Sequence, residues 1–481
     1  MRDLIATGFV SLIILICIIV ITRLLAQGLG PEKFGAYSLA RTVVKTIITF
    51  AILGMNVAIP RYLAFHSNNP EKQKAYIFYG SGGVLVISLF FILVSVVFPN
   101  TVGLFLFGRA QSRFLLYGTL ILMIAHTLHM LTYAFFRGKL RMKYANLFQV
   151  LNIGLIPLFV ALIWARTDAP TVLWAMGIAT IAVIALPFLW QFIGSAFAIN
   201  RSTSQEMKEI YGYSLPRVPA DIGLGLMFVC GPWLAARMGD IREAGYFVVG
   251  QSVLNLISTI LEAIGLVSLP YFARLSGSRE RDALRAQVSV LIGFALHAGI
   301  FATVQLFIFA DWITVLWCGP EYAPAIPLMR VILASAGAYA LYVSVRGAID
   351  ADEVKAINTR NIWISLLFGV VVTVILYMLG LKTLSLAIGL SAGIGMLGLL
   401  SFVFLHKRFS LELNKYNLIL LVLINLTMSV LALLFKYFVP LSKISIIYIP
   451  LLEFIFISIY IFILKLRKVF WVEIFFKKIM G

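Results

Sequence analysis

The sequence predicts an all-α, polytopic membrane protein. Of its 481 residues, 61% are hydrophobic and only 12% are charged, whereas soluble domains carry about 25% charged residues. Apolar runs of about 20 residues, the length that a helix needs to cross a bilayer, recur along the whole chain. Backbone groups in lipid must be satisfied internally, so such runs form helices or closed barrels. The runs lack the ten-residue alternation of barrel strands, which leaves helices.

The apolar runs predict fourteen transmembrane helices with short connections between them. Two six-helix halves are expected to form a parallel repeat, followed by two C-terminal helices. The predicted helices cover residues 4–26, 36–58, 76–98, 112–136, 144–165, 171–195, 215–237, 244–268, 284–310, 324–345, 359–379, 383–405, 416–436 and 446–464.

The repeat is visible in the sequence. Its first copy, from Arg23 to Ala64, reads RLLAQGLGPEKFGAYSLARTVVKTIITFAILGMNVAIPRYLA and places a short turn at residues 30–35 between two apolar helices. Its glycines and proline recur 209 to 211 residues later. The matching pairs are Gly30 with Gly239, Gly35 with Gly245, Gly54 with Gly265 and Pro60 with Pro270. The repeat extends past this segment, because Gly108 matches Gly319 and Arg137-Gly138 matches Arg346-Gly347.

The repeat predicts how the chain is divided. Each copy holds six helices, and an even number returns the chain to the same side of the membrane. The two halves therefore have parallel orientation, an arrangement typical of transporters whose substrate site lies between the halves. The expected parts are an N-terminal half (1–198), a cytoplasmic linker (199–214), a C-terminal half (215–408), helices 13 and 14 (409–464) and a basic interfacial tail (465–481).

The net charge of +19 indicates a membrane orientation rather than nucleic-acid binding. Most of the 39 lysines and arginines lie in the loops on the N-terminal side of the membrane, and cytoplasmic loops are the ones enriched in these residues. We therefore expect a multi-pass protein of the cytoplasmic membrane with both termini in the cytoplasm. The three cysteines are scattered and have no metal-ligand spacing.

Three segments carry a family resemblance: LGPEKFGAY, LGMNVAIPRYLA and, at the start of the second half, YSLPRVPAD. With the length and the two six-helix halves, they resemble the polysaccharide-biosynthesis branch of the multidrug/oligosaccharidyl-lipid/polysaccharide exporter superfamily, which includes O-antigen-type flippases. The resemblance implies a flippase that moves a polyprenyl-diphosphate-linked oligosaccharide across the cytoplasmic membrane by alternating access. It implies membrane lipids, a polysaccharide polymerase and glycosyltransferases as partners, and a lipid-tail groove at helices 13 and 14.

Two other functions stay open. One is a small-molecule antiporter of the MATE type, although helix 1 has an acid only at Asp3, at its very start. The other is a membrane glycosyltransferase, but the longest predicted external loop, 310–323, is short. No Walker A sequence is present, and Gly393-x-Gly395-x-x-Gly398 lies inside an apolar helix without a strand before it. Gly389 and Gly393 instead predict a helix-packing face. We expect no cofactor and no metal.

Polar residues within the predicted spans are the candidate substrate-binding residues, because charge in a bilayer is costly and usually faces a polar cavity. Arg41 and Lys45 are four residues apart and so share a helix face. The repeat places Gln251 and Asn255 at the matching positions. A cationic patch suits an anionic headgroup, since guanidinium binds phosphate in a bidentate way. The alternative for Arg41 is snorkelling to the outer interface.

Arg23 and Arg330 are two further candidates for substrate binding. Arg23 ends the first predicted helix, and superfamily members have functional arginines near this helix end. Arg330 lies within predicted helix 10. For each, the alternative is an interfacial anchor.

Four residues are candidates for proton coupling. His126 and His129 are three residues apart on predicted helix 4, and the alternative is that they are hydrogen-bonded bundle histidines. Asp221 follows two prolines at the start of predicted helix 7, and Glu262 lies on predicted helix 8. Either acid could also lie near the cytoplasmic interface.

Overall fold

The computed structural model is helical throughout the residues it describes, which confirms the predicted class. These are residues 2–108, 113–196, 204–257, 281–352, 357–409, 415–439 and 448–466. Within them, ten helices are long and apolar enough to cross a membrane, or up to eleven when one bent pair is counted as a single span. The predicted count of fourteen is not confirmed. The spans predicted at 4–26 and 36–58 form one helix and the span at 324–345 is bent, whereas those at 244–268 and 446–464 lie partly outside the described residues.

The chain forms two compact units, residues 1–248 and 249–481. The boundary between the two units lies in a helical segment, residues 241–257. The division into halves that the sequence repeat predicts stays a prediction. The elements of unit 1 are α1 (Arg2–Ala51), α2 (Met55–Phe65), α3 (Pro70–Val97), α4 (Pro99–Phe107), α5 (Arg113–Gly138), α6 (Met142–Gln149), η1 (Val150–Leu155), α7 (Ile156–Trp164), α8 (Ala169–Ala196), α9 (Ser204–Ser214), η3 (Leu215–Arg217) and α10 (Val218–Met238).

The predicted turn at residues 30–35 is a break inside α1. Gly30 has φ 72° and ψ 170°, a conformation open almost only to glycine. Pro31 follows, and its fixed φ suits the first turn of the second arm. The second arm ends at Ala51 rather than at the predicted residue 58, because Leu53 and Gly54 both have positive φ. Pro60 then lies inside α2.

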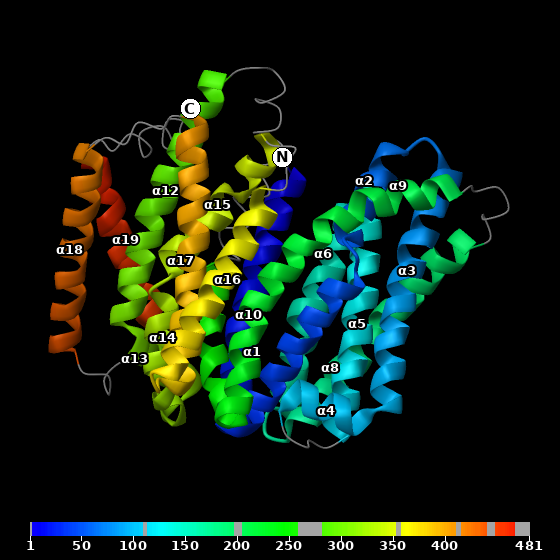
Figure 1. Ribbon diagram of the computed structural model, residues 1–481, viewed down its shortest axis with the longest axis horizontal. Coiled ribbons are helices and arrows are strands. Elements are labelled where there is room, and N and C mark those ends of the chain that lie inside the picture. Colours follow the sequence, from blue (N-terminus) through cyan, green and yellow to red (C-terminus); the bar gives the residue numbers. More distant parts are fainter. Residues whose placement is uncertain are drawn as a thin grey trace. The chain divides into compact units, whose positions relative to one another are not determined.

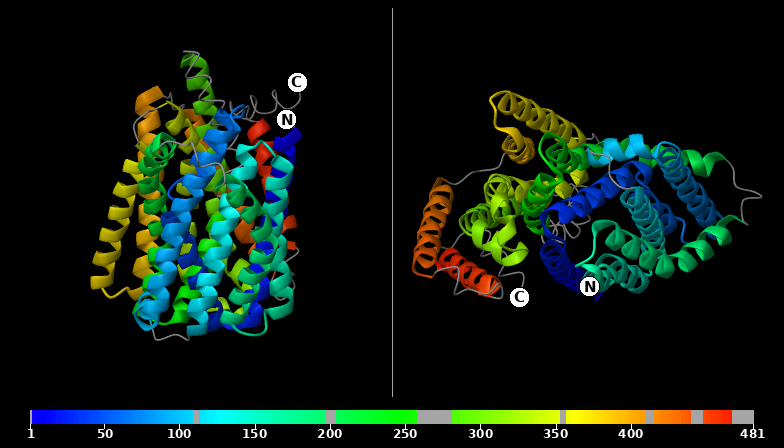
Figure 2. Two further views of the ribbon diagram at one scale, coloured as in Figure 1. Left: turned by 90° about the vertical axis from the view of Figure 1, so that its right-hand side faces the viewer. Right: turned by 90° about the horizontal axis from the view of Figure 1, so that it is seen from below.

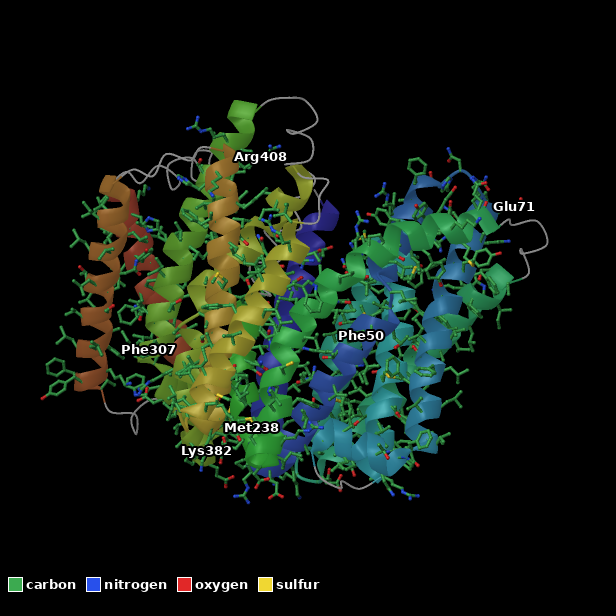
Figure 3. All side chains as sticks on the ribbon, in the orientation of Figure 1. Phe50, Glu71, Met238, Phe307, Lys382 and Arg408 are labelled. Carbon is green, nitrogen blue, oxygen red and sulfur yellow. The ribbon has the colours of Figure 1, made fainter. Side chains whose placement is uncertain are left out.

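Unit 1 has two ends, which we call the α2–α9 end and the Gly30 end. Figure 1 shows α2 and α9 together at one end, and the break in α1 beside α4 at the other. In Figure 3, Glu71 lies at the α2–α9 end and Met238 at the Gly30 end, with Phe50 between them. The helices of unit 1 thus run between two ends that the charge distribution predicts to be cytoplasmic and external, respectively.

The predicted linker (199–214) contains a short helix, α9. It packs tightly on α2 and α3 through glycines. A Cβ at Gly54 would lie 2.8 Å from the carbonyl oxygen of Ser214, and one at Gly83 would collide with the hydroxyl of Tyr211. The Tyr211 hydroxyl also donates to the carbonyl oxygen of Tyr79 at 3.0 Å. Helix α9 is therefore a fixed part of unit 1.

The fifth predicted span contains a π-helical segment, η1, between α6 and α7. Pro157, at the second position of α7, has no N–H to donate to the preceding turn. The wider turn of η1 carries Asn152 toward α5, where its amide donates to Nδ1 of His129 at 3.0 Å. Single π turns of this kind are often found at functional sites.

The two copies of the opening motif contact each other within unit 1. A Cβ at Gly35 would collide with the carbonyl oxygen of Ile241, and a Cβ at Gly245 would lie 2.8 Å from that of Pro31. Pro31 and Ile241 are also separated by the repeat offset, so the contact is reciprocal, as in an isologous interface. Arg242 and Glu32, again 210 positions apart, form an ion pair of 3.2 Å beside it.

Unit 2 holds the rest of the described chain. Its elements are α12 (Arg281–Ile308), α13 (Ala310–Cys318), η4 (Pro320–Ala325), α14 (Ile326–Leu333), α15 (Ala336–Asp352), α16 (Ile357–Met378), α17 (Lys382–Phe409), α18 (Lys415–Phe438) and α19 (Tyr448–Leu466). In Figure 3, Lys382 and Arg408 mark the two ends of α17.

Predicted helix 10, residues 324–345, is broken. The segments on either side of residues 334–335 meet at 49°. The N–H of Gly337 bonds to the hydroxyl of Thr303 on α12 at 2.7 Å instead of to its own helix. Gly337 and Gly299 bring the two backbones close, since a Cβ at Gly299 would lie 3.0 Å from Gly337 Cα. The segment therefore bends and packs against α12 instead of forming one straight helix.

The helix-packing face predicted at Gly389 and Gly393 is confirmed. A Cβ at Gly369 of α16 would lie 2.7 Å from the carbonyl oxygen of Gly389 and 3.3 Å from Gly393 Cα. Close approach of two backbones through small residues is how helices associate in lipid. The glycine-rich pattern thus joins α16 to α17.

Helices α18 and α19 lie side by side and pack on α12 and α13 (Figures 1 and 2). A buried polar group fixes this contact: the hydroxyl of Tyr460 lies 3.0 Å from Nδ1 of His297 and accepts from the Asn425 amide at 3.2 Å. Phe301 packs on the same tyrosine ring, with centroids 4.6 Å apart. These bonds make His297 part of the packing between these helices.

Candidate functional site

The second arm of α1 carries a polar face in the middle of an apolar helix. Arg41 is half-buried and Lys45 is exposed. The Arg41 guanidinium lies 5.7 Å from the ring centroid of Tyr37, and its Nη1 donates to the Tyr37 hydroxyl at 3.2 Å. Tyr37 is itself buried and donates to the sulfur of Met176 at 3.6 Å. Arg41 is thus held on one side, and its other donors have no hydrogen-bond partner among the described residues.

Threonines lie beside this polar face: Thr49 follows Lys45 by one turn, whereas Thr42 and Thr46 each directly follow one of the two cations. The hydroxyls of Thr42, Thr46 and Thr49 each donate to the carbonyl oxygen four residues before them, at 2.8, 3.0 and 2.9 Å. Their oxygens can still accept hydrogen bonds. On α10, a Cβ at Gly225 would have only Thr49 Oγ1 within 4.0 Å, so there is room beside this part of the face. The arrangement offers two cations followed by hydroxyl acceptors.

The two candidate histidines have different surroundings. His126 bonds to the Leu122 carbonyl oxygen at 3.1 Å, and it lies close enough to Arg41 and Lys45 to interact with them electrostatically. His129 is buried between Gln149, whose Oε1 lies 3.2 Å from its Nε2, and Asn152. Within the described ranges, no group of three His, Cys, Asp or Glu residues could hold a metal ion.

The remaining candidates of unit 1 lie on separate helices. Arg23 is half-buried on the first arm of α1, and Asp221 is half-buried in the first turn of α10. Glu262, which belongs to unit 2, lies outside the described residues. The roles of Arg23 and Asp221 therefore stay predictions.

In unit 2, Gln251 is buried, whereas Asn255 is exposed one turn later. Their helix packs on α14 at Gly250, where a Cβ would lie 3.1 Å from Met329 Cα. The two residues share a helix segment as expected. Their part in substrate binding stays a prediction.

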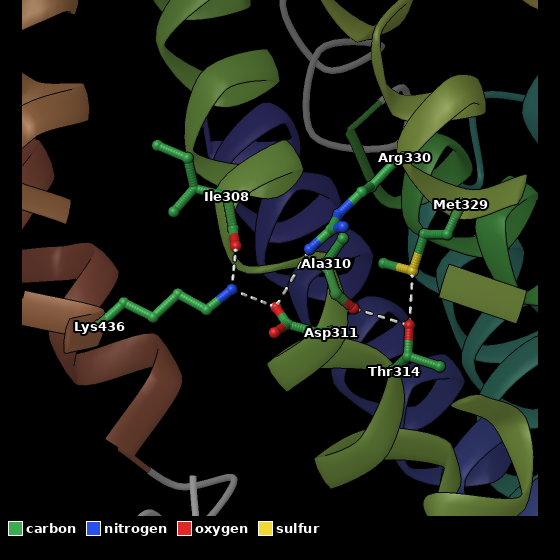
Figure 4. Close-up of polar contacts among 7 residues, drawn as sticks. All are labelled: Ile308, Ala310, Asp311, Thr314, Met329, Arg330 and Lys436. Carbon is green, nitrogen blue, oxygen red and sulfur yellow. Dashed lines mark hydrogen bonds and ion pairs between the residues drawn. The ribbon is translucent and has the colours of Figure 1, made fainter. Parts of the chain in front are cut away.

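Arg330 takes part in an ion cluster that the sequence did not reveal (Figure 4). Asp311, in the first turn of α13, pairs with Lys436 of α18 at 2.6 Å and with Arg330 of α14 at 3.9 Å. Lys436 also donates to the carbonyl oxygen of Ile308 at 2.8 Å. The Nε of Arg330 is buried and has no hydrogen-bond partner among the described residues. One carboxylate thus joins three helices and leaves one excess positive charge.

Loss of the Asp311 carboxylate should loosen α18 from α13. Asp311→Asn should destabilise unit 2 by about 1–3 kcal/mol, between the value of a surface pair and that of a buried one, because Lys436 is only 21% exposed. Lys436→Met should cost less, and the double variant should be no worse than Asp311→Asn alone. Thermal unfolding of the four proteins in detergent measures this. Arg330→Met is the matched control, because its pair is longer; an equal effect would refute the assignment.

Taken together, these features define a polytopic helical membrane protein with charged and polar side chains held inside its spans. A model of the polysaccharide biosynthesis protein family matches residues 1–276, more than half of the chain. The chain belongs to this family.

The curated relatives agree with the family. The chain is 23% identical over 350 residues to the EPS I polysaccharide export inner membrane protein EpsE of Ralstonia nicotianae, which covers 69% of this chain and 77% of the relative. It is 24% identical over 388 residues to the protein of the same name from Ralstonia solanacearum, covering 77% and 85%.

Two solved structures share the fold. The lipid II flippase MurJ in an inward closed conformation matches with a TM-score of 0.70 and 14% identity, over 100% of both chains. An inward-facing multidrug resistance MATE family transporter of the MOP superfamily matches with a TM-score of 0.65 and 15% identity, over 84% of this chain and 98% of that one. At such low identity the likeness concerns the fold.

Proposed function

We propose that this protein is a flippase that moves a polyprenyl-diphosphate-linked oligosaccharide across the cytoplasmic membrane by alternating access. Family membership and the polysaccharide export proteins among its relatives support this class of cargo. The observation that carries the proposal is the polar face on α1, where Arg41 and Lys45 lie one turn apart inside an apolar helix. Cations in this position suit the diphosphate or an acidic sugar of the cargo.

The roles of the side chains follow from their chemistry. Arg41 is positioned by Tyr37 and binds a phosphate or carboxylate, and Lys45 supplies a second charge. The threonine hydroxyls beside this face accept hydrogen bonds from sugar hydroxyls. Gln251 and Asn255, at the matching repeat positions, contribute uncharged contacts to the same substrate, and Arg23 and Arg330 add further cations. His126, His129, Asp221 and Glu262 are the candidates for proton coupling.

Reconstitution tests the proposal directly. Proteoliposomes containing the protein should move a fluorescent lipid-linked oligosaccharide to the outer leaflet, where an impermeant quencher reduces its signal. Protein-free vesicles and vesicles with the Arg41→Ala/Lys45→Ala variant serve as controls.

The MATE fold match supports the antiporter as the second candidate. Efflux of a cationic dye without any movement of the lipid-linked cargo would favour that candidate and reject the flippase.

Membrane orientation is part of the proposal and has its own test. With both termini in the cytoplasm, the α2–α9 end of unit 1 faces the cytoplasm. A cysteine at Lys33, which follows the Gly30 break, should react with an impermeant thiol reagent applied to intact cells, and a cysteine at Lys72 should not. Cys230 must be replaced first, because it is only half-buried. Labelling at Lys72 alone would invert the topology. Ser278, expected on the same side as Lys72, lies outside the described residues.

The proposed partners follow from the cargo. The flippase receives its substrate from glycosyltransferases on the cytoplasmic side and delivers it to a polymerase outside.

The repeat predicts that helices 1–6 superpose on helices 7–12 about an axis near the membrane normal. The reciprocal contact of Gly35 and Gly245 supports this relation, because positions one repeat offset apart meet there.

A further inference from the structure

Two arginines from separate sequence motifs meet at one tyrosine ring. Arg61 belongs to the segment LGMNVAIPRYLA, and Arg217 to YSLPRVPAD. The guanidinium carbon of Arg61 lies 4.1 Å from the ring centroid of Tyr213, and that of Arg217 lies 3.8 Å from it. Two guanidinium groups cannot stack this closely on the same face, so they occupy opposite faces. We call these three residues the Tyr213 clamp.

The helices around Tyr213 hold the clamp in place. Arg61 lies on α2, whereas Tyr213 lies in the last turn of α9 and Arg217 ends η3. The hydroxyl of Tyr62 donates to the carbonyl oxygen of Glu209 on α9 at 3.0 Å, and the Tyr62 ring meets that of Tyr213 edge-on at 5.9 Å. The close seat of α9 on α2 and α3 at Gly54 and Gly83 adds to this. The clamp is thus built on fixed backbone rather than on a free loop.

The positive charges of the clamp are not neutralised locally. Among the residues that the structure describes, neither Arg61 nor Arg217 forms an ion pair, and both are exposed. Arg217 uses one donor, Nη1, on the Tyr213 carbonyl oxygen at 2.8 Å. Glu209, the acid of the same cluster, is bound by the Tyr76 hydroxyl at 2.5 Å and by Gln205 at 3.0 Å. Most guanidinium donors of the clamp are therefore available to an anion.

We propose that the Tyr213 clamp binds the diphosphate of a polyprenyl-diphosphate lipid at the α2–α9 end. Each guanidinium takes one phosphate in a bidentate way, and the aromatic ring keeps the two like charges apart and stacked. This site lies at a helix end, apart from Arg41 and Lys45 in the middle of α1. The inference rests on the proposed function, to which it adds a docking site for the headgroup at the predicted cytoplasmic surface.

Binding of farnesyl diphosphate, a short and soluble polyprenyl diphosphate, tests the clamp. In purified protein, Arg61→Ala and Arg217→Ala should each weaken binding about tenfold or more, the usual effect of losing a charged hydrogen-bonding partner. Tyr213→Phe should bind normally because the ring stays, whereas Tyr213→Leu should bind weakly. Lys143→Ala is the matched control, because it removes an exposed cation near the same end of unit 1. It should change binding less than twofold.

The remaining measurements separate the sources of the anion. Farnesyl monophosphate should bind at least tenfold more weakly than the diphosphate. Displacement of the probe by an equal concentration of phosphatidylglycerol in mixed micelles would identify a general phospholipid contact and overturn the proposal. Unchanged affinity in Arg61→Ala/Arg217→Ala, measured with Arg41 and Lys45 either intact or replaced by alanine, would also overturn it. Flipping by the wild-type protein would then still support the proposed function.

Discussion

Replacing Gly35 by alanine should destabilise the protein and reduce export. A Cβ there would collide with the backbone carbonyl oxygen of Ile241 and lie 3.2 Å from the backbone N of Gly245. Backbone atoms cannot rotate away as a flexible side chain can, and overpacking of this kind costs about 1–3 kcal/mol. Thermal unfolding in detergent measures the loss. We also expect slower transport, because the contact joins the two copies of the repeat at the end that alternating access must close.

Gly82→Ala is the matched control for this prediction. Gly82 lies in α3, and a Cβ there would meet nothing within 4 Å. Since alanine is favoured over glycine in a helix by about 1 kcal/mol, this variant should be slightly more stable than the wild type. Gly245→Ala should behave like Gly35→Ala, because its Cβ would lie 2.8 Å from the Pro31 carbonyl oxygen. Equal stability of the Gly35→Ala and Gly82→Ala variants would show that this contact is not part of the mechanism.

The sequence pattern anticipated this contact only in part. Glycine at offsets of 209 to 211 residues revealed the repeat, and Gly30 with Pro31 marked the break in α1. A repeat states that two positions have similar surroundings, but not that they touch. Gly35 and Gly245 meet because both lie where the two copies of the motif pack on each other. That place depends on the assembled fold.

Breaks in the helices were harder to predict than the helices themselves. Apolar length determines a span, so the class of protein followed from the sequence. The bend at residues 334–335 arises without a proline at its centre, from a bond between Gly337 and Thr303 of another helix. Such tertiary contacts override the local preference for a continuous helix, and they cannot be read from the sequence. The sequence therefore predicted fourteen uninterrupted helices.

Charged clusters were missed for a related reason. Lys436 and Asp311 are separated by more than a hundred residues, and each by itself resembles an ordinary residue at a helix end. Arg61 and Arg217 belonged to recognised motifs, yet only the fold brings both to Tyr213. Arg41 and Lys45 could be predicted, because four residues of helix suffice to place them on one face.

Removal of the charges on α1 should abolish export. Lys45→Ala and Arg41→Ala should each lower transport of the lipid-linked oligosaccharide by about tenfold or more, since a hydrogen bond to a charged group contributes about 1.5–3 kcal/mol. Lys45→Arg should retain more activity than Lys45→Gln, because charge matters more here than length. Gln251→Ala and Asn255→Ala should be milder, since neither leaves an anion without its cation. Complementation of a flippase-deficient strain measures export, and immunoblotting confirms equal protein levels.

Lys33→Ala provides the matched control on the same helix. Lys33 is an exposed cation just past the Gly30 break, and its amino group donates to the Thr167 carbonyl oxygen at 2.9 Å. Its loss changes the net charge by the same amount as Lys45→Ala but does not touch the polar face, so export should stay near the wild-type level. Full activity of the Arg41→Ala/Lys45→Ala variant would show that these cations snorkel to the interface. The cargo would then be bound elsewhere.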